Sequence, residues 1–393
     1  MPEVPATPDV PARPDVPPNP DVPPNPDVIV VGGGIIGLSA AWQLHRDGAE
    51  VVVLDPAPGT GASHAAAGML APIHEAYWGE SHILRLNLAA SQAWPAFAEA
   101  LGADAVDYRR NGMLMAAYDA DDKALLDNLG DLHEQEGLPV ERLRSRECRN
   151  REPLLAPGVR GGVYSPLDHQ ANPRRVVAEL LRRVPTIPVS ATELACNRVV
   201  ADDGRVLDCQ QVVVAAGAWT GRLLGVPIRP IKGQILRLSG PVGLLRLPVR
   251  GVVRGSSVYA VPRSDGEIVV GATQEEQGFD TRVTAGGVYE LLRDVLALLP
   301  GLSEIDLVET WAGLRPGAPD NAPIIGTGDD GIVYATGHYR NGILTAPITA
   351  AAVSALVQGR EPPVDLAAFS PNRFDTKPGV HTPDPEPLSG VPA

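Results

Sequence analysis

The sequence predicts an α/β fold in which a parallel sheet is joined to a second, α+β domain with a large antiparallel sheet. Three features of the 393-residue chain support this prediction. Strand and helix patterns alternate from residue 28, a glycine-rich turn joins the first strand to the first helix, and short β-rich runs separated by Pro and Gly occupy residues 227–271. Alternating strands and helices are typical of parallel sheets, whereas successive β-rich runs are typical of antiparallel meanders.

The parallel sheet is expected to begin with a βαβ unit. The run VIVV predicts a strand over 28–31, the periodic segment that follows predicts a helix over 35–47, and VVVL predicts a strand over 51–54. Two further strands are predicted at 212–217 and 331–337, before a helix over 343–357. Because these elements are far apart in the chain, insertions must interrupt the sheet.

The predicted strands divide the chain into two domains and two tails. The first domain is expected to be discontinuous, over 27–95, 150–226 and 306–369, and the second to comprise 96–149 and 227–305. Residues 1–26 contain a repeated six-residue motif in which proline removes backbone donors, so we expect a disordered tail there. A docking role for this repeat in a proline-recognising groove is the alternative. Residues 370–393 form the predicted C-terminal tail.

Composition excludes several classes of partner and site. The formal net charge of −14 disfavours nucleic acid and anionic membranes, since both need clustered Lys and Arg. The three cysteines, Cys148, Cys196 and Cys209, show no CxxC spacing, so we expect neither a disulfide framework nor a metal site. No signal-peptide pattern and no membrane-length apolar run is present, which predicts a cytoplasmic location.

The turn after the first predicted strand has the pattern of a dinucleotide-binding site. Gly32, Gly34 and Gly37 form GxGxxG between a strand and a helix, and Asp55 ends the second strand. The glycines permit a tight turn and a close approach of pyrophosphate to the helix N-terminus, and the carboxylate suits ribose hydroxyls. The alternative is an ordinary glycine loop with a surface carboxylate. The context favours a Rossmann-like nucleotide-binding domain.

Later segments favour FAD over NAD. The small residues of 61–72, the end of the strand over 212–217 and the segment 337–344 would all reach the C-terminal edge of the sheet, as a long cofactor requires. A flexible Ala/Gly loop is the alternative for 61–72. The candidate FAD-binding residues are Gly32, Gly34, Ile35, Ile36, Gly37, Asp55, Ser63, Ala66, Ala67, Gly68, Met69, Gly217, Trp219, Gly337, Arg340, Asn341, Gly342, Ile343 and Leu344.

With these segments identified, the chain resembles the D-amino acid oxidase family of flavoproteins, and within it the glycine oxidases associated with thiamine biosynthesis. The resemblance runs from about Val28 to Phe369. It is carried by GGGIIGLSAAWQL, GASHAAAGML, VVVAAGAW, PIKGQILRL, YAVPR, IVVGAT, WAGLRPG and GHYRNGILTAPIT. The resemblance implies an FAD-binding domain and a substrate-binding domain with the large antiparallel sheet.

The resemblance also implies three catalytic residues. Arg315 of LRPG would bind the substrate carboxylate, Tyr259 of YAVPR would donate a second hydrogen bond to it, and the backbone of Arg340 would lie beside the substrate amine and the flavin. A planar, permanently charged guanidinium suits carboxylate. A structural ion pair for Arg315 and simple packing for Tyr259 are the alternatives.

The implied reaction is oxidative deamination of glycine, sarcosine or small D-amino acids to the 2-oxo acid. Ammonia and hydrogen peroxide would be released, O₂ would be the second substrate, and the product would feed thiamine thiazole synthesis. The alternatives are a sarcosine or D-amino acid oxidase or dehydrogenase of the same fold and, more remotely, a non-catalytic FAD-binding interaction protein. The sequence leaves open whether the chain forms a homo-oligomer.

Two departures from the family pattern matter. Sarcosine oxidases attach their flavin to a cysteine near the C-terminal motifs, and none of the three cysteines lies there, so FAD is expected to be noncovalent. Gln274 stands after the GAT motif, where relatives often carry an apolar residue, which leaves the preferred size of the substrate open.

Overall fold

The computed structural model describes residue 23 and residues 25–374. The predicted N-terminal tail over 1–26 therefore lies almost wholly outside the described residues, as does most of the predicted tail over 370–393. The first residues of that second tail are folded: η4 (Pro371–Phe374) is a 3₁₀ turn, and its Arg373 Nε lies 2.8 Å from an Asp320 carboxylate oxygen. Among the described helices, none is both long and apolar enough to cross a bilayer.

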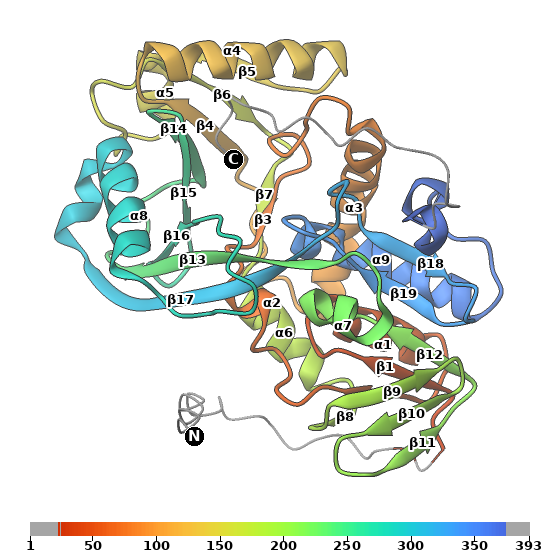
Figure 1. The fold of residues 1–393 in the computed structure, drawn as a ribbon. Coiled ribbons are helices and arrows are strands. Elements are labelled where there is room, and N and C mark those ends of the chain that lie inside the picture. The colour runs from red at the N-terminus through yellow and green to blue at the C-terminus, as the bar shows by residue number, and fades with distance from the viewer. Residues whose placement is uncertain (1–22, 24, 375–393) are drawn as a thin grey trace.

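A six-stranded sheet forms the nucleotide-binding half of the molecule (Figure 1). Its strands are parallel, except that the first two of the order pair antiparallel. The predicted strands over 28–31 and 51–54 are confirmed, and those over 212–217 and 331–337 are shorter than predicted. The order is β18 (Ile324–Thr327), β19 (Val333–Thr336), β12 (Gln211–Val214), β1 (Val28–Val31), β2 (Val51–Leu54) and β8 (Thr186–Ile187).

Both faces of this sheet are buried, which explains its uninterrupted apolar strands. Alternate residues of β1 belong to different cores: Val28 and Val30 face one side, and Ile29 and Val31 face the other. The first side is covered by helices and the second by an antiparallel meander. The helices are α1 (Ile35–Arg46), α3 (Ser81–Leu101), α6 (Pro173–Leu181) and α9 (Gly342–Val357), and the meander strands are β9 (Ala191–Ala195), β10 (Arg198–Ala201) and β11 (Val206–Asp208).

The second sheet has eight strands and is antiparallel except where β14 pairs with β4. Figure 1 shows it on the left, with β13 and β17 extending toward the six-stranded sheet on the right. The predicted antiparallel runs of 227–271 form four of its strands. The order is β17 (Asp306–Gly317), β13 (Arg229–Ser239), β16 (Glu267–Gly271), β15 (Ser256–Pro262), β14 (Val249–Val253), β4 (Met113–Ala117), β6 (Gly161–Ser165) and β5 (Glu141–Arg144).

Two of these strands come from ranges that the sequence assigned to the other domain. β6 lies within 150–226 and β17 within 306–369, yet both are hydrogen-bonded into the eight-stranded sheet. The sequence-based division at residues 150 and 306 is therefore displaced for these two strands. The reason is physical: an isolated strand run does not reveal which sheet will satisfy its backbone groups.

The remaining elements cover the eight-stranded sheet, link the two halves or, like α7 (Thr220–Leu224) and η3 (Ala367–Phe369), pack against the cores of the nucleotide-binding half. A core that includes Leu291, Val295 and Leu298 packs one helix, α8, against the face of the sheet that is turned away from the nucleotide-binding half. The remaining elements are α2 (Ala62–Ala65), β3 (Met69–Leu70), α4 (Ala120–Gln135), α5 (Ser145–Arg151), β7 (His169–Gln170), η1 (Gly217–Trp219), α7 (Thr220–Leu224), α8 (Ala285–Leu298), η2 (Pro300–Glu304) and η3 (Ala367–Phe369).

Candidate active site

One continuous cavity runs from the C-terminal edge of the six-stranded sheet to the eight-stranded sheet. The structure brings most of the predicted site residues together along it. Those that line it are Gly32, Gly34, Ile35, Ile36, Asp55, Ser63, Ala66, Ala67, Gly68, Met69, Gly217, Trp219, Tyr259, Arg315, Arg340, Asn341, Gly342 and Ile343.

The glycine turn and Asp55 form one end of this cavity. An Asp55 carboxylate oxygen accepts a 2.7 Å hydrogen bond from the Gly33 N–H, and the Ser63 hydroxyl oxygen accepts a 2.9 Å bond from the Ile35 N–H. Burial raises the pKa of the Asp55 carboxyl, while the Gly33 and Ala57 amides oppose that rise. The carboxylate thus fixes the turn and still presents free lone pairs, as a ribose site needs.

Three of the predicted cofactor residues do not line the cavity. A Cβ on Gly37 would overlap the Gly32 carbonyl oxygen, so this glycine serves the close contact of α1 with β1. Gly337 has a φ of +74° and makes the turn after β19. Leu344 is buried in the core, where its carbonyl oxygen accepts a 2.7 Å hydrogen bond from Trp94. Gly37, Gly337 and Leu344 thus have packing or turn roles in the structure, and their direct contact with a cofactor stays a prediction.

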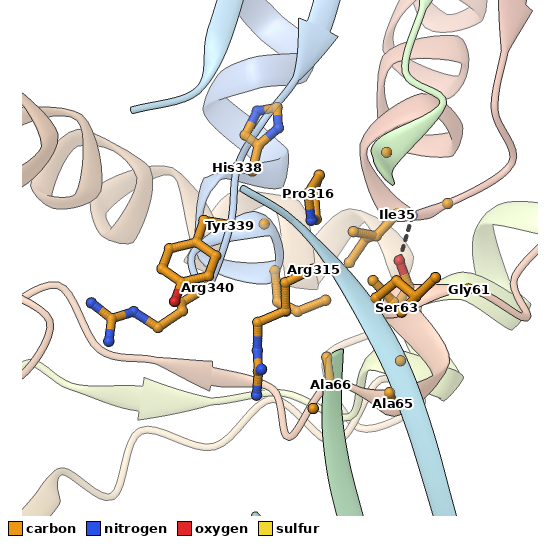
Figure 2. A pocket seen from close by; sticks show the side chains of 18 of the residues that line it. Ile35, Gly61, Ser63, Ala65, Ala66, Arg315, Pro316, His338, Tyr339 and Arg340 are labelled. Atoms are coloured by element: carbon orange, nitrogen blue, oxygen red, sulfur yellow. Dashed lines mark hydrogen bonds between the residues drawn. The ribbon is translucent and has the colours of Figure 1, made fainter. Parts of the chain in front are cut away.

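The N-terminus of α9 forms the middle of the cavity. Its N-cap residue Asn341 makes no side-chain capping bond, and the same holds for Gly34 at α1. Apart from the Ile35 N–H, which donates to Ser63, first-turn N–H groups of both helices are therefore available to a ligand. Tyr339, just before α9, has a φ of +45°, a strained conformation for a non-glycine residue and one that often marks a binding site. Figure 2 shows Ile35 and Ser63 on one side of the cavity and Arg315, Tyr339 and Arg340 on the other.

At the far end of the cavity, two glycines of the floor leave room for the side chains of neighbouring strands. A Cβ on Gly233 of β13 would overlap the Arg315 guanidinium, and one on Gly271 of β16 would overlap the Tyr259 hydroxyl. The two glycines lie on neighbouring strands between β17 and β15, which carry Arg315 and Tyr259. The strand order therefore lets both side chains lie flat and meet.

Arg315 and Tyr259 form a pair that can bind an anion. Arg315 Nη1 donates to the Thr273 carbonyl oxygen at 3.1 Å, and the Tyr259 hydroxyl interacts with the guanidinium. Burial raises the pKa of the Tyr259 phenol, while the charges of Arg315 and Arg250 oppose that rise. Tyr259 is therefore protonated at neutral pH and can donate a hydrogen bond.

Two charged residues at this end were missed by the sequence interpretation. Glu75 and Arg250 both line the cavity, and Arg250 Nη1 lies 2.5 Å from a Glu75 carboxylate oxygen. Arg340 Nε lies 3.5 Å from the other oxygen of Glu75. The sequence held one signal for Arg250, which is an arginine between apolar residues inside a β-rich run. It held none for Glu75, which lies in a loop without a recognisable pattern.

His338 also lines the cavity, but its chemistry is that of a neutral side chain. Burial lowers the pKa of its imidazole to about 3, and its Nε2 lies 3.1 Å from the Thr349 hydroxyl. No cluster of His, Cys, Asp and Glu suited to a metal ion occurs among residues 25–374. None of the three cysteines lines the cavity.

These features fit the predicted FAD. The two helix N-termini, neither of which is capped by the side chain of its own N-cap residue, suit the pyrophosphate and the electron-rich flavin edge. Gly34 faces the cavity with no neighbour closer to a Cβ position than the Ser63 hydroxyl at 3.5 Å. Asp55 lies beside the same turn. One extended dinucleotide can therefore contact both helix ends along the cavity.

Comparison with known proteins also indicates that this chain binds FAD. The family model "FAD dependent oxidoreductase" (DAO) matches residues 27–356. The bifunctional protein ThiO/ThiG of Trichormus variabilis is 33% identical over 363 residues, which cover 88% of this chain and 55% of that protein. The chain thus spans about half the length of the ThiO/ThiG proteins that it matches. Glycine oxidase of Geobacillus kaustophilus is 33% identical over 375 residues, covering 90% of this chain and 98% of that protein.

Solved structures give the same result. The crystal structure of glycine oxidase from Geobacillus kaustophilus superposes with a TM-score of 0.82 at 31% identity, covering 89% of this chain and 99% of that chain. Iminodiacetate oxidase from Chelativorans sp. BNC1 superposes with a TM-score of 0.77 at 28% identity, covering 88% and 98%. The resemblance drawn from the motifs is confirmed: this chain belongs to the DAO family of FAD-dependent oxidoreductases.

Proposed function

We propose that this chain is an amino acid oxidase that converts glycine or another small amino acid to the 2-oxo acid, with release of ammonia and hydrogen peroxide. The observation that carries the proposal is the Arg315–Tyr259 pair on its glycine floor, in the same cavity as the N-terminus of α9. When bound, FAD would accept the hydride from the substrate α-carbon.

The protein's own contribution is orientation. Arg315 would bind the substrate carboxylate through two N–H donors, and the neutral Tyr259 phenol would add a third. The backbone near Arg340 would then lie beside the amine, with the α-carbon directed toward the start of α9. Holding reactants in one geometry can supply several kcal/mol of the barrier, roughly 7–11 in the best cases.

No side chain needs to remove a proton from carbon in this scheme. The substrate reacts as the neutral amine, whose lone pair assists departure of the hydride. His338 fits this absence of a required base, because burial lowers the pKa of its imidazole to about 3 and so makes it a weak proton acceptor. Water then hydrolyses the oxidised product to the 2-oxo acid.

The relatives support glycine as a first substrate to test. A Geobacillus relative is named glycine oxidase, and other relatives are named bifunctional protein ThiO/ThiG. We propose in addition that the product supplies thiamine thiazole synthesis. The proposal extends to small D-amino acids and to sarcosine, which would release methylamine in place of ammonia, since the polar Gln274 lines the cavity.

An anaerobic flavin titration tests the proposal. Glycine, sarcosine and D-alanine are added in turn to the purified protein, and loss of the flavin absorbance is followed before O₂ is admitted. We expect bleaching by at least one of them and one peroxide per turnover on reoxidation. Bleaching without peroxide would identify a dehydrogenase, and no bleaching by any amino acid would contradict the proposed function.

A further inference from the structure

A second group of charged side chains lies in the same cavity beyond Tyr259, and its role as part of a substrate site rests on the proposed function. The group consists of Glu75, Arg250 and Arg340. A substrate with one carboxylate is already served by Arg315 and Tyr259. The second group therefore needs a role of its own.

Strand register places Arg250 directly beside Tyr259. Arg250 of β14 is paired with Tyr259 of antiparallel β15, so the two side chains share the face that lines the cavity. Ser257 lies two residues before Tyr259 on the same face and also lines the cavity. Along the floor of the cavity, the side chains thus follow one another in the order Arg315, Tyr259, Arg250.

The Arg250 guanidinium has N–H donors that its hydrogen bonds to described residues do not use. In the described part of the chain, its side-chain hydrogen bonds both start from Nη1, one to the His74 carbonyl oxygen at 3.0 Å and one to Glu75 at 2.5 Å. Its Nη2 and Nε groups remain for a ligand. The Arg250 side chain is 15% exposed, so the guanidinium is largely removed from bulk water.

The charges at this end do not balance. Burial raises the pKa of the Glu75 carboxyl, but the charges of Arg250 and Arg340 more than reverse that rise, so its pKa lies below the usual value and it is ionised at neutral pH. Among the residues that line the cavity, three guanidiniums, Arg250, Arg315 and Arg340, face the one carboxylate of Glu75, while Glu80 acts on Arg340 from outside this lining. A substrate with a single carboxylate, bound by Arg315 and Tyr259, leaves the largely buried Arg250 to share Glu75 with Arg340, whereas buried charges are normally paired.

We propose that Arg250, together with Arg340, forms a binding position for a second substrate carboxylate. The preferred substrates are then amino acids whose side chain or N-substituent ends in a carboxylate. Gln274 and Ser257 also line the cavity, and their polar groups suit the same kind of substrate. The competing interpretation is that Arg250 only neutralises Glu75.

Matched acids and amides separate these interpretations. The holoenzyme is assayed with D-aspartate against D-asparagine, and with iminodiacetate against its monoamide, so that each pair differs in one charge. We expect kcat/KM for the acid to exceed that for the amide by at least about tenfold in one pair, the equivalent of a charged hydrogen bond. Acid-to-amide ratios near one in both pairs would overturn the proposal.

Variants then assign the preference to a residue. Arg250→Gln is expected to lower the acid-to-amide ratio about 10- to 100-fold, because it removes the charge and the forked donors. Arg254→Gln is the matched control, since Arg254 lies four residues along the same hairpin, is exposed, and packs on Tyr118 outside the cavity. An unchanged ratio in Arg250→Gln would overturn the proposal. If that variant does not fold, Arg250→Lys serves, and it is expected to lower the ratio by a smaller factor.

A binding measurement keeps this proposal separate from the proposed function. Succinate and succinamate lack the reactive amine, and their dissociation constants for the holoenzyme are measured by calorimetry. Tighter binding of succinate that is lost in Arg250→Gln supports the carboxylate position even if no amino acid bleaches the flavin. Equal binding of the two, in a protein that does oxidise glycine, contradicts the position alone.

Discussion

At the scale of single residues, contacts with its neighbours fix the side chain of Arg315 before any substrate binds. Gly233 leaves the space that its guanidinium fills, and the Thr273 carbonyl oxygen fixes one of its nitrogens. An arginine that is already oriented loses little conformational entropy on binding a carboxylate. Among the described residues, the hydrogen bonds of this guanidinium go to the Lys232 and Thr273 carbonyl oxygens and not to a carboxylate, so the side chain is suited to recognition rather than to an internal ion pair.

Replacing Arg315 tests its role. Arg315→Leu removes a charged, forked contact of ~1.5–3 kcal/mol, so we expect KM for glycine to rise ~10- to 100-fold. Steady-state peroxide production over a range of glycine concentrations gives the value. Arg229→Leu, at the exposed start of β13, is the control and should keep the parent KM. A parental KM in Arg315→Leu would refute the carboxylate assignment.

At the scale of elements, the two helices α1 and α9 bring their N-termini to one cavity although their first residues, Ile35 and Gly342, are more than three hundred positions apart in the sequence. They pack on each other through a shared core, which fixes the relation between their ends. Glycines adjust this arrangement in two distinct ways. Gly37 permits the close contact of α1 with β1, whereas Gly34 clears space on the cavity side.

Two alanine substitutions separate these roles. Gly37→Ala forces a Cβ against the Gly32 carbonyl oxygen, and overpacking of this kind costs about 1–3 kcal/mol, so the melting temperature of the apoprotein should fall by several degrees. Gly34→Ala meets only the Ser63 hydroxyl at 3.5 Å, so the apoprotein should melt normally while the Kd for FAD rises at least about tenfold. Melting curves and flavin fluorescence titrations measure the two effects. The same response in both variants would show that the two roles are not separate.

At the scale of the whole molecule, the cavity is built from both sheets, so a bound cofactor should tie the two halves together. A ligand present at 100 times its Kd stabilises the form that binds it by about 2.7 kcal/mol. We expect removal of FAD to lower the melting temperature by a few degrees and added FAD to restore it.

The same preparation tests noncovalent attachment. Acid precipitation should leave all the flavin in the supernatant, because none of the three cysteines lines the cavity. Flavin that stays with the pellet would contradict this expectation, and equal melting of the apo and holo forms would contradict the stabilising role.

Buried histidines make stability depend on pH. Burial lowers the pKa of His133 to about 4 and that of His338 to about 3, against about 6.5 in the unfolded chain. At pH values between the folded and the unfolded pKa, the unfolded state binds more protons than the folded state. The contribution of each histidine to the free energy of unfolding is therefore complete above pH 6.5 and decreases as the pH falls toward 4. Each histidine contributes a slope of up to about 1.4 kcal/mol per pH unit.

Denaturant unfolding at several pH values between 7 and 4 measures this slope. His133→Gln keeps a donor for the Ile73 carbonyl oxygen and should reduce the slope, whereas His45→Gln on the exposed side of α1 should not. A slope that is unchanged in His133→Gln would exclude this residue as a source of the pH dependence.

Local patterns in the sequence determined the βαβ unit, the glycine turn with Asp55, the late helix start and the long cofactor, because strand period, helix period and turn chemistry are written in neighbouring residues. The tertiary structure decided which sheet takes β6 and β17, and it placed Arg250 and Glu75 beside Tyr259. Strand pairing and side-chain proximity depend on contacts between distant parts of the chain, and no local pattern encodes a contact of that kind.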